Sequence, residues 1–353
     1  MALYDYGNTR LRARLSELQP IEKLESWADL NSIDSLISAL TKTSYKESIE
    51  KALTFAHGYE CVNQAMKFSS AEILEDLMRF YQGEEQEMIK MIFFRNDLQN
   101  LKAIFRGVLH GTPLDQVTSA FSHMGTISEP ILNHLVRSES LAELINHMAL
   151  FQLPVSQPLL ELRSARESLS SADIELAMER WYFHEIGKML AGRSENVHIL
   201  RQFYQIEADI INLNTVLRFI GSNIGHDVIG EQLSEFLIDA GFLGKARMLT
   251  ISKLHNIENL IKSLLGTRYG PFLKAGLDCY QSTRLLSEFE NQLRMYSLNW
   301  AARLPRLHPL GIGVALGYVA LKRSEIKNLR WIAKGIISGF EPIYIRENLE
   351  RTA

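Results

Sequence analysis

Three stretches of this sequence repeat a carboxylate, an amide and a cation at one spacing. They read DLQNLKAIFRG, DIINLNTVLRF and EIKNLRWIAKG and begin at Asp97, Asp209 and Glu325. In each stretch an Asn follows the acid by three residues, and an Arg or Lys follows it by nine. The Asn residues are Asn100, Asn212 and Asn328, and the cations are Arg106, Arg218 and Lys334. Carboxylates on helices hold metals only together with further carboxylates and His, and no His stands in the repeat.

Other motifs with catalytic or metal-binding chemistry are incomplete. HEIGK at His184 lacks a second His four residues after the first, and ENVH at Glu195 is a single ExxH where a di-iron bundle needs two. The GK at Gly187 lacks the upstream Gly and the following Ser or Thr of a phosphate loop, and neither GxGxxG nor GxSxG occurs. We therefore predict no catalytic residues, no cofactor and no metal, although active sites are also assembled from distant residues.

The apolar residues around the repeated positions have helical spacing. Leu98, Leu101, Phe105 and Val108 are spaced 3, 4 and 3, and the other two copies have the same spacing. This pattern indicates one apolar stripe on an amphipathic helix. On such a helix the acid projects near the stripe and the Asn lies at its edge. We expect each acid and Asn to be a half-buried, hydrogen-bonded pair that ties its helix to a neighbour, with a carboxylate metal site as the alternative.

The repeated cations fall on the opposite side of the stripe. Arg106, Arg218 and Lys334 should therefore be exposed. If the copies are related by a threefold axis, the three cations form a ring on the assembled surface, where they would contact a partner. The simpler alternative is three solvated surface charges.

A second repeated pattern shows that the copies are larger than one helix. IDSLISAL, LAELINHM and IENLIKSL begin at Ile33, Leu141 and Ile257, in the same order as the acid stretches. A third pattern, LTKTSY ending at Tyr45 and LLGTRY ending at Tyr269, lacks a clear match in the LFQLPV of the second copy. The period is domain-sized and too long for a solenoid repeat.

These patterns predict an all-α fold of three similar helical domains in a pseudo-threefold arrangement. Gly- and Pro-rich segments place the boundaries near Gly111–Thr112 and Asn223–Gly225, which gives units 1–111, 112–224 and 225–353.

Composition narrows the class of protein. The net charge of −3 does not favour nucleic acid as a partner, although nine Lys or Arg against four Glu from Ala301 onward allow a basic face there. Two Cys exclude a disulfide framework and suit a reducing compartment. The N-terminus lacks an apolar core of signal-peptide length, and the longest apolar stretch, from Leu310 to Leu321, is shorter than the roughly 20 residues of a membrane span. We therefore expect a soluble, cytoplasmic protein that meets a membrane only through a partner.

Several segments resemble the C subunit of archaeal and bacterial V/A-type rotary ATPases, the family that includes the d subunit of eukaryotic V-ATPases. The similar segments are YGNTRLRARL near the start, LTKTSYKESIEKAL, the stretch from Asp97 to Gly107, and above all the C-terminal PLGIGVALGYVALKRSEIKNLRWIAKGIISGFEPIYIRENL. Departures are the missing Thr-x-Tyr of the second copy and the Arg323–Ser324 pair before Glu325.

The resemblance implies a funnel of three helical domains that sits on the proteolipid ring of the membrane sector. The funnel would receive the central shaft and transmit torque during ion pumping or ATP synthesis, as one copy per complex and without catalysis, small-molecule substrate or nucleic acid. A soluble helical scaffold unrelated to membranes remains the alternative, and an enzyme with its site in a central cavity is a third possibility.

Overall fold

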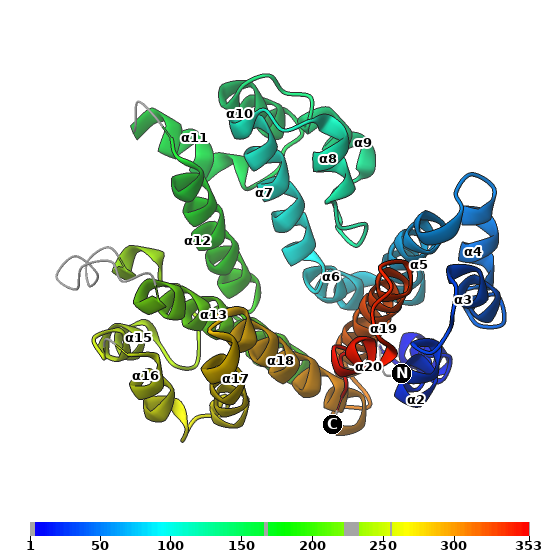
Figure 1. Ribbon diagram of the computed structural model, residues 1–353. Helices are drawn as coiled ribbons and strands as arrows, with labels where there is room; N and C mark the ends of the chain where they lie inside the picture. Colours follow the sequence, from blue (N-terminus) through cyan, green and yellow to red (C-terminus); the bar gives the residue numbers. More distant parts are fainter. Residues whose placement is uncertain (1–3, 166–168, 222–232, 255, 353) are drawn as a thin grey trace. The chain divides into compact units, whose positions relative to one another are not determined.

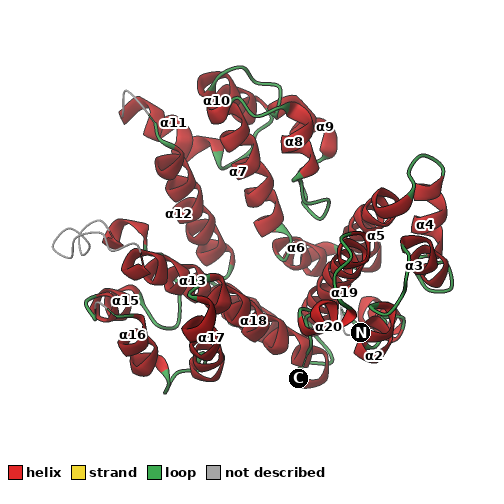
Figure 2. Cartoon of the chain, viewed as in Figure 1, coloured by secondary structure: helices red, strands yellow, loops and turns green. Residues whose placement is uncertain are grey.

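The chain folds into helices joined by short loops. The computed structural model describes residues 4–165, 169–221, 233–254 and 256–352. Within these ranges the regular elements are helices and no strand occurs, which confirms the all-α class (Figures 1 and 2).

The helices follow one another in three similar series. The first series is α1 (Asp5–Ser16), α2 (Ile21–Trp27), α3 (Ile33–Leu40), α4 (Lys46–Leu53), α5 (Gly58–Phe80), α6 (Gly83–Met91) and α7 (Phe94–His110). The second is α8 (Leu114–Ser119), α9 (Glu129–Leu135), α10 (Leu141–Leu150), α11 (Ser156–Ala165), α12 (Ser171–Met189) and α13 (Glu195–Gly221). The third is α15 (Lys245–Ser252), α16 (Ile257–Leu264), α17 (Gly270–Thr283), α18 (Ser287–Leu307), α19 (Gly313–Ile337) and α20 (Pro342–Glu347).

Each series contains the same short helix with the same kind of start. The helices α3, α10 and α16 begin directly after an N-cap residue: Ser32, Ser140 and Asn256. The side chain of each N-cap accepts a hydrogen bond from a backbone N–H of the first turn, which satisfies one of the unpaired donors of a helix start. The Leu-Ile pattern of the sequence repeat thus marks one helix type, which recurs three times.

The same connection follows this short helix in all three series. Residues 41–45, 151–155 and 265–269 link it to α4, α11 and α17, so each connection has five residues. A long helix follows (α5, α12 and α18), and then the helix with the repeated acid (α7, α13 and α19). In the first series α6 stands between these two helices.

The described residues group into two compact units. One comprises Met1–Gln99, Ser122–Ile127 and Leu298–Ala353, and the other comprises Asn100–Phe121 and Ser128–Ser297. The predicted boundary at residues 111 and 112 lies between α7 and α8. The boundary predicted at residues 224 and 225 lies outside the described residues. Compact units and repeat units are different divisions of a chain, and the three-unit division remains a prediction.

Helix α19 is the centre of the first unit. It packs against α1, α2, α3 and α5, and Figure 1 shows it lying along α5. Its residues from Gly313 to Val319 are all buried, so this part of the helix is covered on every side. This core therefore accounts for most of the longest apolar stretch of the sequence, whose first residue, Leu310, is exposed.

The second unit has a core built on α13 and α15–α18. Its buried side chains come from all five helices and from the segments beside them, and include Leu213, Leu260, Tyr269, Leu273 and Phe289. Helices α10, α11 and α12 extend the unit, each packed on the next, and α12 packs on α13.

Candidate functional site

Glu325 on α19 lies in a buried set of donors. Its Oε1 accepts a hydrogen bond from the backbone N–H of Gln19 at 2.6 Å. Its Oε2 accepts from the hydroxyl of Tyr45 at 2.6 Å and from Nζ of Lys322 at 2.8 Å. The same Nζ lies 3.9 Å from the centroid of the Tyr45 ring. Burial, with the nearby Glu325 charge, raises the pKa of Tyr45 well above its ordinary value, so Tyr45 stays a donor.

Asp209 on α13 has an equivalent arrangement. It accepts hydrogen bonds from the backbone N–H of Phe242 at 3.0 Å and of Leu243 at 3.1 Å, and from the hydroxyl of Tyr269 at 2.7 Å. Gly241 allows this approach, because a Cβ at that position would stand 2.0 Å from Oδ1 of Asp209. Burial raises the pKa of Asp209 above its ordinary value of 3.8, and the three donors oppose that rise.

Asp97 on α7 completes the set with a different hydroxyl. It accepts from Oγ1 of Thr126 at 2.6 Å and from the backbone N–H of Ile127 at 2.9 Å. Burial raises its pKa as well, against the effect of these two donors. Tyr45 directly precedes α4, and Tyr269 directly precedes α17. The equivalent residue, directly before α11, is Val155. Val155 is buried and has no hydroxyl, and the hydroxyl on Asp97 comes from Thr126.

The three acids therefore share one type of contact. Each acid accepts hydrogen bonds from at least one backbone N–H and from one side-chain hydroxyl. For Asp97 and Asp209 these donors belong to the next series of helices. For Glu325, which lies in the third series, they belong to the first series. The spacing between donors agrees: Gln19 precedes Tyr45 by 26 residues (45 − 19), and Leu243 precedes Tyr269 by 26 (269 − 243). With their oxygens engaged in this way, the carboxylates hold loops and helices together, since buried polar groups require partners.

Two of the repeated Asn residues clamp a backbone segment. Asn212 donates to the carbonyl of Ile238 at 2.8 Å and accepts from its N–H at 2.8 Å. Asn328 makes the same pair of bonds with Glu350, at 2.9 and 2.8 Å. Asn100 is equally buried. The predicted acid and Asn residues thus lie deeper than a helical wheel indicates, and these contacts go to neighbouring segments instead of joining acid to Asn.

The three repeated cations are exposed on their helices, and two of them form ion pairs within the chain. Arg106 donates from Nε and Nη2 to the two carboxylate oxygens of Glu175 on α12, at 2.6 and 2.7 Å. Arg218 donates to Oε1 of Glu290 on α18, at 2.7 Å from Nη2. Lys334 has instead an aromatic neighbour, with Nζ at 5.8 Å from the ring centroid of Tyr59 on α5.

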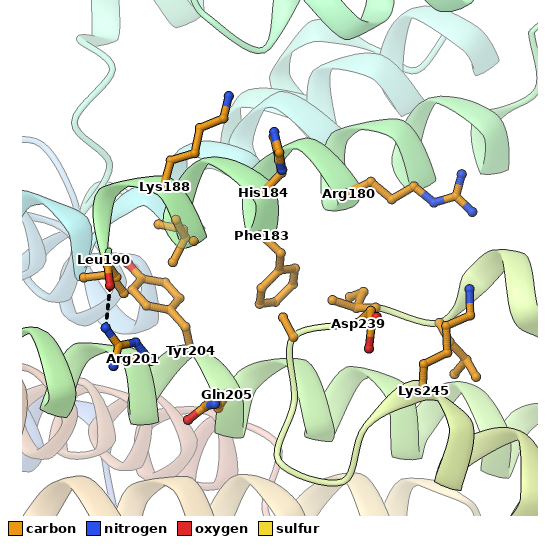
Figure 3. Close-up of a pocket in the computed structure, with 15 residues that line it drawn as sticks. Arg180, Phe183, His184, Lys188, Leu190, Arg201, Tyr204, Gln205, Asp239 and Lys245 are labelled. Atoms are coloured by element: carbon orange, nitrogen blue, oxygen red, sulfur yellow. Dashed lines mark hydrogen bonds between the residues drawn. The ribbon is translucent and has the colours of Figure 1, made fainter. Parts of the chain in front are cut away.

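A cavity of about 840 Å³ lies in the second unit between α12, α13 and residues 237–245 (Figure 3). Phe183 and Tyr204 point into it, and His184 and Lys188 project away from it. Arg201 at one end donates to the carbonyls of Leu190 and Gly192, which close the C-terminal end of α12.

Sequence reasoning missed this cavity, because its lining comes from three segments without a shared motif. The described residues that line it include one carboxylate, that of Asp239, and one imidazole, which points away.

Two structural observations bear on membranes and metals. Across the described ranges, none of the helices combines the length and the apolar character needed to cross a bilayer. Nowhere in the described part of the chain do three His, Cys, Asp or Glu side chains meet as a metal site requires.

Comparison with known proteins places the chain in a family. A family model described as ATP synthase (C/AC39) subunit matches residues 7–348. The C subunit of the A-type ATP synthase of Methanocaldococcus jannaschii is 23% identical over 351 residues, which cover 99% of this chain and 86% of that protein. The C subunit of the V-type ATP synthase of Thermus thermophilus is 26% identical over 346 residues, which cover 98% of both chains. The resemblance inferred from the repeat and the C-terminal segment is confirmed, and the chain belongs to the ATP synthase (C/AC39) subunit family.

Proposed function

We propose that this chain is the non-catalytic socket of a rotary ATPase, which links the central shaft to the proteolipid ring of the membrane sector. In this role it is a spacer in the rotor that transmits torque during ATP-driven ion pumping or ion-driven ATP synthesis. Membership of the ATP synthase (C/AC39) subunit family supports a place in such a complex. The contacts with the shaft and the ring and the transmission of torque go beyond family membership and are the proposal itself.

The observation that carries the socket role is the order of the acid contacts. Asp97 accepts from residues of the second series, Asp209 from the third and Glu325 from the first. A chain in which each unit holds the next, and the last holds the first, is closed on itself. Closure supports three units of residues 1–111, 112–224 and 225–353 around a pseudo-threefold axis, with a funnel for the shaft between them.

Torque transmission requires a part that resists twisting. The acid contacts meet this demand, because buried hydrogen bonds between units, unlike exposed ion pairs, are not weakened by solvent. A closed set of three needs no second copy, so we infer one copy per complex, peripheral to the membrane through the ring. Neither a small-molecule substrate nor nucleic acid belongs to this role.

The proposal is tested by affinity purification of the tagged chain from membranes in mild detergent, with mass spectrometry of the bound proteins. We expect a proteolipid and shaft subunits in the eluate. Recovery from the cytosol without any rotary ATPase subunit would contradict the proposal and would favour a helical scaffold unrelated to membranes.

The partner contact of Arg106, Arg218 and Lys334 remains a prediction. The ion pairs of Arg106 and Arg218 give these two residues a role within the chain. Charge reversal at all three positions should weaken recovery of the complex if the cations meet a partner, and unchanged recovery would speak against that contact.

A further inference from the structure

The first acid helix carries two neighbouring cations that are both paired within the chain. Lys102 and Arg106 stand one helical turn apart on α7. Nζ of Lys102 lies 2.5 Å from Oε1 of Glu179 on α12, and Arg106 binds Glu175 on the same helix with two hydrogen bonds. Two cations thus face two carboxylates.

The third helix with a repeated acid, α19, carries cations at the corresponding positions, but no carboxylate of the described residues pairs with them. Arg330 and Lys334 stand one turn apart on α19, and among the described residues neither forms an ion pair. Nε of Arg330 is buried without a hydrogen-bond partner. The helix that faces them, α5, presents Tyr59 near Lys334, and the adjacent Glu60 instead bonds within its own helix.

Arg330 is a partly buried cation whose charged form is disfavoured by burial. Burial lowers the pKa of Arg330, because removal from water disfavours the charged guanidinium. A half-buried cation with an unpartnered donor is costly in the isolated chain, and an added carboxylate removes that cost.

Apolar side chains continue the same surface. Ile337 follows Lys334 by three residues on the same face of α19 and is 55% exposed. Phe340 and Tyr344 are exposed as well, and their rings pack on Trp331, which follows Arg330 in the chain. Aromatic residues and Arg together are typical of the centre of a protein–protein interface.

We propose that this α19 face, formed by Arg330, Lys334 and Ile337 with Tyr59 beside them, docks a partner protein segment that presents a carboxylate next to apolar side chains. The partner's carboxylate takes the place that Glu175 and Glu179 have opposite α7. The inference rests on the proposed function, in that the partner is another subunit of the complex. Two cations beside aromatic residues fit a short acidic segment better than nucleic acid, which is bound through many phosphate contacts.

The test is carbodiimide cross-linking of the complex purified with the tagged chain. The reagent joins a Lys amine and a carboxylate in direct contact through an amide bond, with loss of one water. We expect a cross-link from Lys334 to an Asp or Glu of another subunit, located by mass spectrometry. Lys327 provides the internal control, because its Nζ lies 2.6 Å from Glu350 of the same chain and should be linked in every sample.

Two variants separate charge from reactivity. Lys334→Arg keeps the cation, and should lose the cross-link while the complex is recovered at the wild-type level. Lys334→Glu should reduce recovery by about tenfold, because it sets two carboxylates against each other. Arg330→Glu should act in the same direction, and Lys334→Glu remains decisive if that half-buried replacement unfolds the chain, since Lys334 is exposed.

The outcomes distinguish failure of the inference from failure of the function. A recovered complex in which Lys334 is linked only within its own chain, or not at all while Lys327 is linked, would overturn the docking site and leave the socket role standing. Without any recovered complex, the proposed function itself fails. Flotation with phosphatidylglycerol vesicles that depends on Lys334 would replace the protein partner with an anionic lipid surface and overturn the proposal.

Discussion

Tyr45 and Tyr269 place their hydroxyl groups on buried carboxylates more than fifty residues away in sequence. The sequence indicated the tyrosines and the acids as separate repeats, but did not indicate that they meet. A backbone N–H donor can belong to almost any residue type, so the sequence does not show which donor a carboxylate binds. The backbone partners of Asp97, Asp209 and Glu325 could therefore not be predicted. The loss of tyrosine at Val155 was visible, whereas its replacement by the Thr126 hydroxyl was not.

Replacement of Tyr269 by Phe should destabilise the chain by about 1.5–3 kcal/mol, the usual contribution of a hydrogen bond to a charged group. Asp209 then keeps its two amide donors and loses the third. Chemical denaturation of the variant measures the change in free energy of unfolding. Tyr280→Phe is the matched control in the same core, because the Tyr280 hydroxyl has no hydrogen bond among the described residues, and the cost there should stay within about 0.5 kcal/mol. Equal costs at both positions would contradict the assigned role of Tyr269.

The raised pKa of Asp209 makes its contribution to stability depend on pH. The folded state holds this proton more tightly than the unfolded chain, so the contribution is complete below the ordinary pKa of 3.8 and is lost as pH rises through the raised folded value. Asp209→Asn does not titrate. The wild-type advantage in unfolding free energy over this variant should therefore shrink as the pH rises from about 4 through the raised folded pKa. An advantage that grows with pH would mean that the three donors outweigh burial.

At the scale of elements, helical spacing was sufficient to predict the helices that carry the repeated acids. The apolar stripe from Leu98 to Phe105 lies on α7, and the Leu-Ile pattern lies on α3, α10 and α16. The second connection was not matched because LFQLPV, which ends at Val155, has neither the Thr nor the Tyr of the other two connections. Helix α10, at 10 residues, is also two residues longer than α3 and α16, although the connection that follows it keeps its length. The local structure is therefore preserved where the residue types are not.

Helix α12 contains a glycine that its packing does not require. A Cβ on Gly187 would meet nothing within 4 Å, and its φ lies outside the left-handed region. Gly187→Ala should therefore stabilise the chain by up to about 1 kcal/mol, through higher helix propensity and a less flexible unfolded state. The midpoint of denaturation measures the gain. Destabilisation would show that the cavity beside α12 needs the room that Gly187 leaves.

At the scale of the whole molecule, the first compact unit is assembled from both ends of the chain. Helix α19 supplies Glu325 to Gln19 and Tyr45, and Asn8 of α1 donates to the carbonyl of Gly311 at 3.1 Å. The first helices of the chain thus contact residues about three hundred positions later. The N-terminal helices of this unit therefore depend on the C-terminal helix α19 for their packing.

This dependence predicts the effect of ending the chain at Ser297. The core around Leu260 and Phe289 keeps its members, whereas α3 and α5 lose the helix that packs against both, and α4 packs on these two helices. Amide hydrogen exchange, followed by mass spectrometry, should then show loss of protection across α3–α5 with protection retained in α16 and α17. Addition of the missing segment as a separate peptide should restore protection in α3–α5 if the contacts of α19 are the cause. Full protection of α3–α5 in the shortened chain would instead mean that the first series folds by itself, and that the contacts of Glu325 with Gln19 and Tyr45 are not needed for folding.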